Sequence, residues 1–314
     1  MARSVIHRTE MLGATLDLGG APIDLSEYAT TGLFAVAVGP RGNGKTNSGL
    51  LIAEQLAVQG WVSVLIDPEG ELESMYGDAV KNPEDLHKRL SHRKDPIIVV
   101  SAQDASGFLP YGNVILHAAE EHRKPIFVMI DEGKIFSAGK KRKGEIGEAS
   151  DIINQFAERG RKRALDVFIT AHRYSGTLHR SLFTNKNLTL VGSQEDPTAW
   201  SSLAPLFRSS KIEFGDLNAL APGEFFCFSR RGVEKIKMPM AKALEKVAPK
   251  SKVPKRTLPT TFSQWNRAMR EIPTERLSVL TDPVINLLGA VAGLSSQQML
   301  SGVRALQDEL EFRQ

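Results

Sequence analysis

The chain has almost no cysteine: its 314 residues include a single one, Cys227, so no disulfide can form within it. This composition fits a reducing compartment. The sequence also lacks a run of the roughly 20 apolar residues that a membrane-spanning helix needs. Its first residues, MARSVIHRTEMLG, lack the apolar centre of a secretory signal. We therefore predict a cytoplasmic protein with no membrane partner.

Charge of one sign is not strongly in excess. The formal net charge is +4 and the pI is about 9.1, which permits nucleic-acid binding without identifying it. Apolar residues make up 41% of the chain and charged residues 24%, ordinary values for a globular protein with one large domain or two smaller ones.

The stretch AVAVGPRGNGKT, residues 35–46, is the strongest motif that is present. It matches G-x-x-x-x-G-K-[ST] at every fixed position, between a predicted strand over Phe34–Val38 and a predicted helix over Lys45–Gln59. A chance glycine-rich turn is the alternative, but it would not require both flanking elements. This pattern predicts a phosphate-binding loop.

The predicted cofactors are ATP and Mg²⁺. Backbone N–H groups of the loop and the positive end of the helix would face the phosphates, Lys45 would reach the β- and γ-phosphates, and the Thr46 hydroxyl would hold Mg²⁺. The expected nucleotide-binding residues of this loop are Gly39, Arg41, Gly42, Asn43, Gly44, Lys45 and Thr46.

Apolar runs alternate with helical stretches from Gly32 onward, which predicts βαβ units and an α/β fold with a mostly parallel sheet. The expected strands are Phe34–Val38, Val62–Ile66, Ile97–Val100, Ile126–Ile130, Val167–Thr170 and Leu188–Val191, with a closing hairpin of Phe225–Ser229 and Val233–Lys237. The expected helices are Lys45–Gln59, Pro83–Leu90, Gly112–Glu121, Gly144–Leu165 and Thr177–Leu182.

Four segments are predicted along the chain. They are an N-terminal arm (residues 1–31), an ATPase core (32–240), a basic linker (241–257) and a small C-terminal helical segment (258–314). Residues 241–256 hold six Lys or Arg against one Glu, a local balance of +5. That linker is either a solvated connector or a contact for DNA or a partner.

A second constellation follows the strand Ile126–Ile130, which ends in Asp131 and Glu132. We expect Asp131 to hold Mg²⁺ opposite Thr46, and Glu132 to orient or deprotonate the attacking water. A turn that happens to carry two acids is the alternative. Acids also follow the strand Val62–Ile66, in Asp67-Pro68-Glu69-Gly70-Glu71; these either support the metal site or form an ordinary Asp-Pro turn.

The third constellation is basic. The helix end Glu158-Arg159-Gly160-Arg161-Lys162-Arg163 leads through a strand to Ala171-His172-Arg173. An arginine offered to the ATP of a neighbouring subunit would stabilise transition-state charge. His172 could sense the γ-phosphate, although a lone histidine is more often structural.

These motifs, in this order, resemble the HerA/FtsK superfamily of DNA-pumping ATPases, and the HerA branch more than FtsK. The matching elements are GPRGNGKT, VLIDPEGELESMYG, FVMIDEGKIF and FAERGRKRALDVFITAHRYSGTLH, within residues 34–238. The resemblance implies a RecA-like core, a ring expected to contain six subunits, and ATP-driven movement along double-stranded DNA. It makes Arg161 the expected trans-acting arginine.

This sequence departs from the HerA pattern in two places. His172 stands where the family usually has glutamine, and the first 31 residues are too few for the N-terminal β-barrel of HerA members. Ring assembly or partner docking can therefore differ.

A run of four cations, Lys140, Lys141, Arg142 and Lys143, lies between glycines after the Asp-Glu strand end. In a ring, such a loop could grip DNA phosphates without reading bases. The alternative is a loop kept soluble by its charge.

Together the motifs predict an ATPase that works as a homo-oligomeric ring and moves double-stranded DNA. One alternative is a viral genome-packaging motor of the same superfamily, which would act in the host cytoplasm. Another is an ATP-dependent assembly switch for a partner nuclease or effector, with little movement of its own.

Overall fold

The computed structural model describes residues 13–92, 94–121, 125–137, 143–163, 165–174 and 178–247. One compact unit, Met1–Ala248, contains all of them. The predicted DNA contacts Lys140, Lys141 and Arg142, and the C-terminal segment 258–314, lie outside the described residues, as does the side chain of Arg161. Among the described helices, none combines the length and apolar character needed to cross a bilayer.

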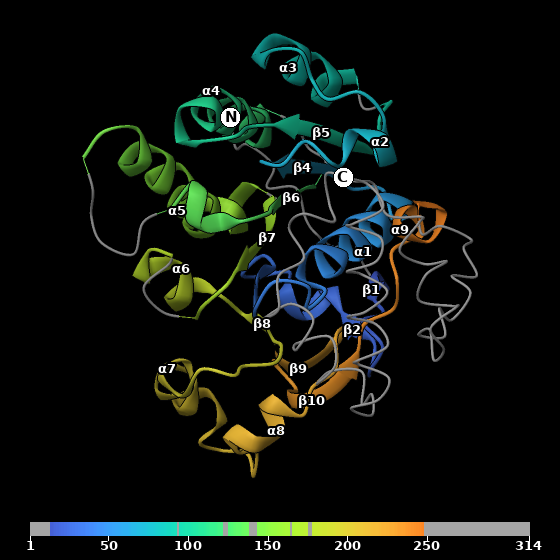
Figure 1. Cartoon of the computed structure of the whole chain (residues 1–314). Coiled ribbons are helices and arrows are strands. Elements are labelled where there is room, and N and C mark those ends of the chain that lie inside the picture. The colour runs from blue at the N-terminus through green and yellow to red at the C-terminus, as the bar shows by residue number, and fades with distance from the viewer. Residues whose placement is uncertain are drawn as a thin grey trace, which may run out of the picture. The chain divides into compact units, whose positions relative to one another are not determined.

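An eight-stranded sheet forms the centre of the fold (Figure 1), in the order β10-β9-β8-β3-β7-β6-β4-β5. Strands β3 to β8 run parallel, and β9 and β10 add an antiparallel hairpin at one edge. This confirms the predicted α/β class and mostly parallel sheet. The strands are β3 (Phe34–Val38), β4 (Val62–Asp67), β5 (Ile97–Ser101), β6 (Ile126–Ile130), β7 (Leu165–Ala171), β8 (Leu188–Val191), β9 (Glu224–Ser229) and β10 (Gly232–Lys237).

Helices cover both faces of the sheet, which explains why its strands are apolar on both sides. In β3, Val36 and Val38 face one core while Ala35 and Ala37 face the other. Helices α3 (Pro83–His92), α4 (Ala105–Glu121), α5 (Glu145–Arg163), α6 (Arg180–Asn185), α7 (Pro197–Phe207) and α8 (Phe214–Asn218) pack on the Val36 side. Helices α1 (Lys45–Val58), α2 (Glu73–Tyr76) and α9 (Lys242–Val247) belong to the Ala35 side.

The N-terminal residues 13–31, predicted as part of an arm, pack into the core. They form a small sheet of β1 (Thr15–Leu16) and β2 (Ile23–Asp24), and Leu16 and Leu18 are buried on the α1 side of the main sheet. Two glutamines fix this segment: Gln55 of α1 exchanges hydrogen bonds with the backbone of Asp17, and Gln59, the residue after α1, does so with that of Thr15. The core therefore begins earlier than the predicted residue 32.

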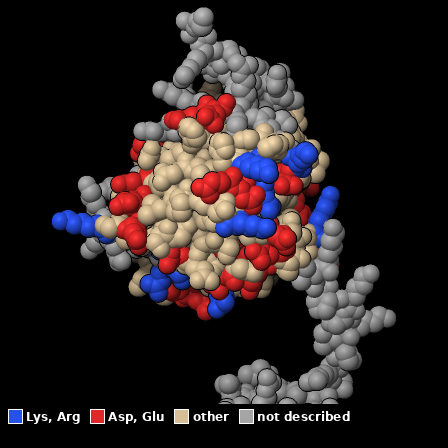
Figure 2. Space-filling view, turned by 90° about the horizontal axis from the view of Figure 1, so that it is seen from above, with Lys and Arg blue, Asp and Glu red and all other residues tan. Residues whose placement is uncertain are grey.

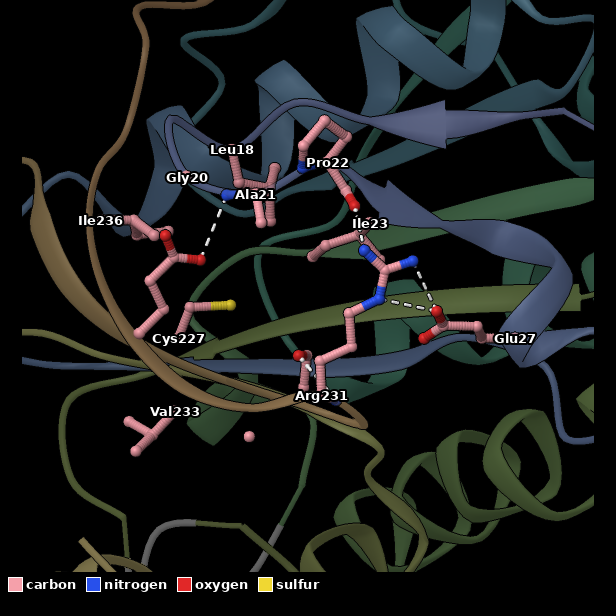
Figure 3. A pocket seen from close by; sticks show the side chains of 13 residues that line it. Leu18, Gly20, Ala21, Pro22, Ile23, Glu27, Cys227, Arg231, Val233 and Ile236 are labelled. Atoms are coloured by element: carbon pink, nitrogen blue, oxygen red, sulfur yellow. Dashed lines mark hydrogen bonds and ion pairs between the residues drawn. The ribbon is translucent and has the colours of Figure 1, made fainter.

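The same N-terminal segment and the β9–β10 hairpin enclose a cavity of about 250 Å³ (Figure 3). Arg231 closes one side through an ion pair with Glu27 (Nη2–Oε1 2.6 Å) and a hydrogen bond to the Pro22 carbonyl. Cys227 lines the cavity, and burial raises the pKa of its thiol to about 12. Of the described residues that line it, none belongs to the phosphate-binding loop.

Helix α9 occupies the first residues of the predicted linker. Its N-terminal backbone donors are capped from α1: Glu54 accepts hydrogen bonds from the N–H groups of Lys242 (2.7 Å) and Ala243 (2.9 Å). Glu54 also accepts from the Tyr76 hydroxyl (2.8 Å). Ala241 and Ala243 are both buried, so helix α9 belongs to the core and not to an exposed connector.

Several helix boundaries also differ from the prediction. Helix α4 begins at Ala105 instead of Gly112, because Asp104 caps its first turn (Gly107 N to Oδ1, 2.8 Å) and Pro110 is accommodated inside it. Helix α5 ends at Arg163, and Leu165 opens β7. Helix α6 begins at Arg180, later than the predicted Thr177.

Helices α7 and α8 were missed by the prediction. The first has a recognisable start signal, since Asp196 accepts from Thr198 N (2.8 Å) as N-cap and Pro197 occupies the first turn.

Candidate active site

The carboxyl ends of β3, β7 and β6 lie next to one another and form the floor of the candidate site. The register pairs Ala37 of β3 with Thr170 of β7, and Ile130 of β6 with Ile169 of β7. Thr170 therefore stands between the phosphate-binding loop and Asp131. Open α/β sheets bind ligands at such strand ends.

The loop between β3 and α1 has the backbone shape that the glycine motif predicts. Gly42 (φ 78°) and Gly44 (φ 92°) adopt left-handed conformations that other residues rarely take. A side chain on Gly44 would also lie 3.4 Å from the Cα of Gly223, whose N–H donates to the Asn43 carbonyl (3.1 Å). Gly223, the residue before β9, thus packs against the loop.

The side chain of Asn43 is buried against the residues that follow β8. Its side chain is 4% exposed, and Nδ2 donates to the Ser193 hydroxyl just beyond β8 (2.8 Å). Any side chain on the adjacent Gly192 would overlap the Asn43 amide. Asn43 therefore anchors the loop to β8, while its backbone remains part of the loop. Arg41, in contrast, is exposed at the tip.

Lys45 curls back over the loop. Its Nζ donates to the Pro40 carbonyl (2.8 Å), and the residue is 6% exposed. Burial lowers the pKa of Lys45, while the nearby carboxylates of Glu132 and Asp131 act in the opposite direction. A cation held beside two acids at the mouth of a phosphate-binding loop is suited to bridging a polyphosphate and the acidic strand end.

Thr46 and Asp131 meet directly, although 85 residues separate them in sequence. The Thr46 hydroxyl donates to Asp131 Oδ2 at 2.9 Å. Both offer hard oxygen atoms, which is the donor set that Mg²⁺ prefers. The structure brings together the two residues predicted to share the metal.

Thr170 is a site residue that the sequence analysis missed. Its hydroxyl donates to Asp131 Oδ1 (2.6 Å) and accepts from the N–H of Glu132 (2.9 Å). The residue is completely buried. It therefore fixes both the carboxylate of Asp131 and the backbone of Glu132. Pairing the predicted strands Ile126–Ile130 and Val167–Thr170 in parallel would have placed Thr170 beside Asp131. The sequence alone does not show that these two strands are neighbours in the sheet.

Glu132 is the only described residue other than glycine with positive φ (48°, ψ 50°). This left-handed conformation costs a non-glycine residue roughly 1–2 kcal/mol, and such outliers cluster at functional sites. Its N–H is held by Thr170 and by the Asp131 carboxylate (3.1 Å). The strained backbone turns the Glu132 side chain toward β7.

His172 is the partner of the Glu132 carboxylate. Its Nε2 lies 2.9 Å from Glu132 Oε2, and Lys134 Nζ lies 3.5 Å from the same atom. His172 follows the end of β7, one position beyond the residue paired with Val38 of β3. It lies within the candidate site as predicted, but its contact is with the acid.

Asp67, at the end of β4, has a different environment. It is 3% exposed, Oδ1 accepts from the N–H groups of Glu69 (3.1 Å) and Gly70 (3.0 Å), and Oδ2 accepts from that of Leu72 (2.8 Å). These bonds form the Asp-Pro turn, one of the two alternatives drawn from the sequence. Glu69 and Glu71 are exposed.

Of the predicted basic DNA contacts, the structure describes only Lys143, which is exposed. On the face in Figure 2, the described Lys and Arg side chains lie among Asp and Glu and form no continuous basic surface. The predicted DNA-binding role of residues 140–143 remains a prediction.

No protein-family profile matches the chain, and no curated protein sequence is similar to it. Solved structures are similar. The genome packaging NTPase B204 from Sulfolobus turreted icosahedral virus 2, in complex with AMPPCP, superposes with a TM-score of 0.51 at 16% identity, covering 66% of this chain and 98% of that one. The cytoplasmic domain of the Thermomonospora curvata Type VII secretion ATPase EccC superposes with a TM-score of 0.51 at 13% identity, covering 73% of this chain and 26% of that one.

The fold is that of a RecA-like P-loop NTPase core. At these identities the likeness establishes the fold alone. The RecA-like core expected from the sequence resemblance is thereby confirmed.

Proposed function

We propose that this chain is a P-loop ATPase of the FtsK/HerA superfamily that hydrolyses ATP in a homo-oligomeric ring and moves double-stranded DNA. The observation that carries the ATPase part is the contact of Thr46 with Asp131 at 2.9 Å, with Glu132 next to it in a strained conformation.

The proposed nucleotide site is built from three groups. Backbone N–H groups of Gly42 to Lys45 and the Lys45 side chain bind the phosphates. The oxygens of Thr46 and Asp131 hold Mg²⁺, which neutralises phosphate charge when bound. Solved complexes of the viral NTPase with AMPPCP and ATP-γS support nucleotide binding in this fold.

Glu132 takes the role of general base in this proposal. Its carboxylate would accept a hydrogen bond, and then a proton, from the water that attacks the γ-phosphate. Thr170 keeps the residue in place through the Glu132 N–H. His172 shares the Glu132 carboxylate and is therefore suited to releasing or holding it as the γ-phosphate comes and goes.

The ring and the movement of DNA are proposed from two features of the sequence and from a structural neighbour. The sequence resemblance supplies Arg161 as the arginine that completes a neighbouring subunit's site. The run of four cations at residues 140–143, between two glycines, supplies a candidate loop for gripping DNA phosphates. A structural neighbour described as a genome packaging NTPase is consistent with work on DNA.

The test is steady-state ATP hydrolysis with and without long double-stranded DNA. We expect Mg²⁺-dependent hydrolysis that DNA stimulates several-fold, and its loss in Glu132→Gln. Glu69→Gln is a matched control, because it makes the same chemical change at an exposed acid after the neighbouring strand β4. Hydrolysis that is indifferent to DNA would contradict the motor and favour the partner switch. Equal loss in both variants would contradict the role of Glu132.

Genome packaging is the second candidate. It is favoured by the 98% coverage of the viral NTPase, since this chain contains a counterpart of nearly that whole protein. Capsid genes beside the gene for this chain would support packaging, whereas an adjacent nuclease gene would support the HerA-like alternative.

A further inference from the structure

Two histidines and one glutamate meet on the outer surface of helices α3 and α4, which pack against each other. His117 and Glu121 are one helical turn apart on α4, and His87 comes from α3. The packing of the two helices thus places His87 next to His117 and Glu121. None of the three residues belongs to the phosphate-binding loop or to a strand end.

The three side chains converge on one carboxylate. His117 Nε2 lies 3.1 Å from Glu121 Oε1, and His87 Nε2 lies 3.6 Å from Glu121 Oε2. The two imidazole rings are stacked with centroids 6.3 Å apart and an interplanar angle of 24°. Their potential ligand atoms all lie within 4.8 Å of one another.

This donor set matches a particular class of ion. Two imidazole nitrogens and one carboxylate oxygen are ligands that Zn²⁺ accepts in three-residue sites, with a fourth position left for water. Mg²⁺ and Ca²⁺ prefer oxygen ligands and fit poorly.

The spacing requires only a small adjustment. Zn²⁺ binds nitrogen and oxygen at about 2.0–2.2 Å, so its ligand atoms lie roughly 3.3 Å apart. The side chains of His87, His117 and Glu121 are 45%, 60% and 46% exposed. They can therefore rotate to bring their ligand atoms from within 4.8 Å of one another to the spacing that Zn²⁺ needs.

An ion-pair network is the competing explanation, but it fits less well. It accounts for the two contacts with Glu121, but not for the approach of the two imidazoles to each other, whose rings are stacked and whose ligand nitrogens also lie within 4.8 Å. A divalent cation would draw all three ligand atoms to one point.

We propose that His87, His117 and Glu121 form a surface site for a divalent transition-metal ion, Zn²⁺ being the best match, which links helix α3 to helix α4. The ion would fasten α3 to the helix that packs beside it at the β5 edge of the sheet (Figure 1). The site is independent of the proposed ATPase function.

The experiment is calorimetric titration of the full-length chain with Zn²⁺, after removal of any affinity tag and of bound metal by EDTA. We expect a zinc-binding event that His87→Ala and His117→Ala each weaken at least about tenfold. Excess Mg²⁺ should not compete. Zn²⁺ should also raise the melting temperature of the wild type by about 2–5 °C, and not that of either variant.

His92→Ala is the matched control, since His92 also lies on α3 but its Nδ1 lies 2.8 Å from the Lys88 carbonyl, outside the cluster. It should bind Zn²⁺ like the wild type. Because His117 is exposed and His87 is only partly buried, all variants should melt like the wild type without metal. Wild-type affinity in His117→Ala, or no binding of Zn²⁺ by the wild type at about 100 μM, a weak limit for a protein site, would overturn the proposal.

Discussion

Two aspartates end neighbouring strands of the sheet, and their partners differ. Asp67 closes β4, and its two oxygens accept from three backbone N–H groups of the turn that follows it. Asp131 follows β6. Its Oδ2 accepts from the hydroxyl of Thr46, and its Oδ1 accepts from the hydroxyl of Thr170 and from the N–H of Glu132. The same residue type thus has two uses at one edge of the sheet.

The difference shows how to separate a structural acid from a functional one. Both oxygens of Asp67 accept from backbone N–H groups that hold its own turn, so metal binding there would compete with the turn. Asp131 Oδ2 accepts from the side-chain hydroxyl of Thr46, a bond that can be exchanged for a cation without changing the backbone. Burial alone would mislead, since Asp67 is 3% exposed while Asp131 is only partly buried.

Asp131→Asn should give the largest effect. The amide removes the charge that would hold Mg²⁺, and its NH₂ group cannot accept from a hydroxyl. We expect kcat for ATP hydrolysis to fall by about 10²–10³-fold. The melting temperature without nucleotide should stay within about 2 °C of the wild type. A rate above about one tenth of the wild-type rate at saturating Mg²⁺ would show that Asp131 is not a metal ligand.

Asp67→Asn makes the identical change at the neighbouring strand end and should have the opposite profile. The new NH₂ group faces the N–H of Leu72, so a buried charge-assisted hydrogen bond is lost. We expect a loss of about 1–3 kcal/mol in the free energy of unfolding. Thermal denaturation would detect this as a fall of about 3–10 °C, with kcat at 25 °C nearly unchanged. Loss of hydrolysis at an unchanged melting temperature would instead place Asp67 in the metal or water site.

This pair also shows how far the sequence leads. The phosphate-binding loop and the Asp131–Glu132 strand end were predictable, because a strand, a short loop and a helix follow one another locally. The role of Asp67 could not be predicted, because the sequence pattern of an acid after a buried strand is the same whether that acid binds backbone N–H groups or a metal.

Long-range contacts account for the rest. The packing of residues 13–31 depends on Gln55 of α1 and on Gln59 just after it, which no local pattern identifies. Helix α9 depends on Glu54, a residue almost two hundred positions away. Helix α7 is a different kind of miss, since Asp196 and Pro197 do carry its start signal.

Thr170→Val should give the smallest effect and sharpens the comparison further. Valine keeps the shape in this completely buried position but removes the hydroxyl that links Asp131 to the N–H of Glu132. Losing one hydrogen bond to a charged group corresponds to about 1.5 kcal/mol, so kcat should fall about tenfold. Thr170→Ser is the matched control, because it keeps the hydroxyl and loses only a methyl group. If both variants lose the same activity, packing of the methyl group explains the loss, and Thr170 does not position the two acids. If only the valine variant is slow, Asp131 and Glu132 depend on a side chain from the strand between them and the phosphate-binding loop.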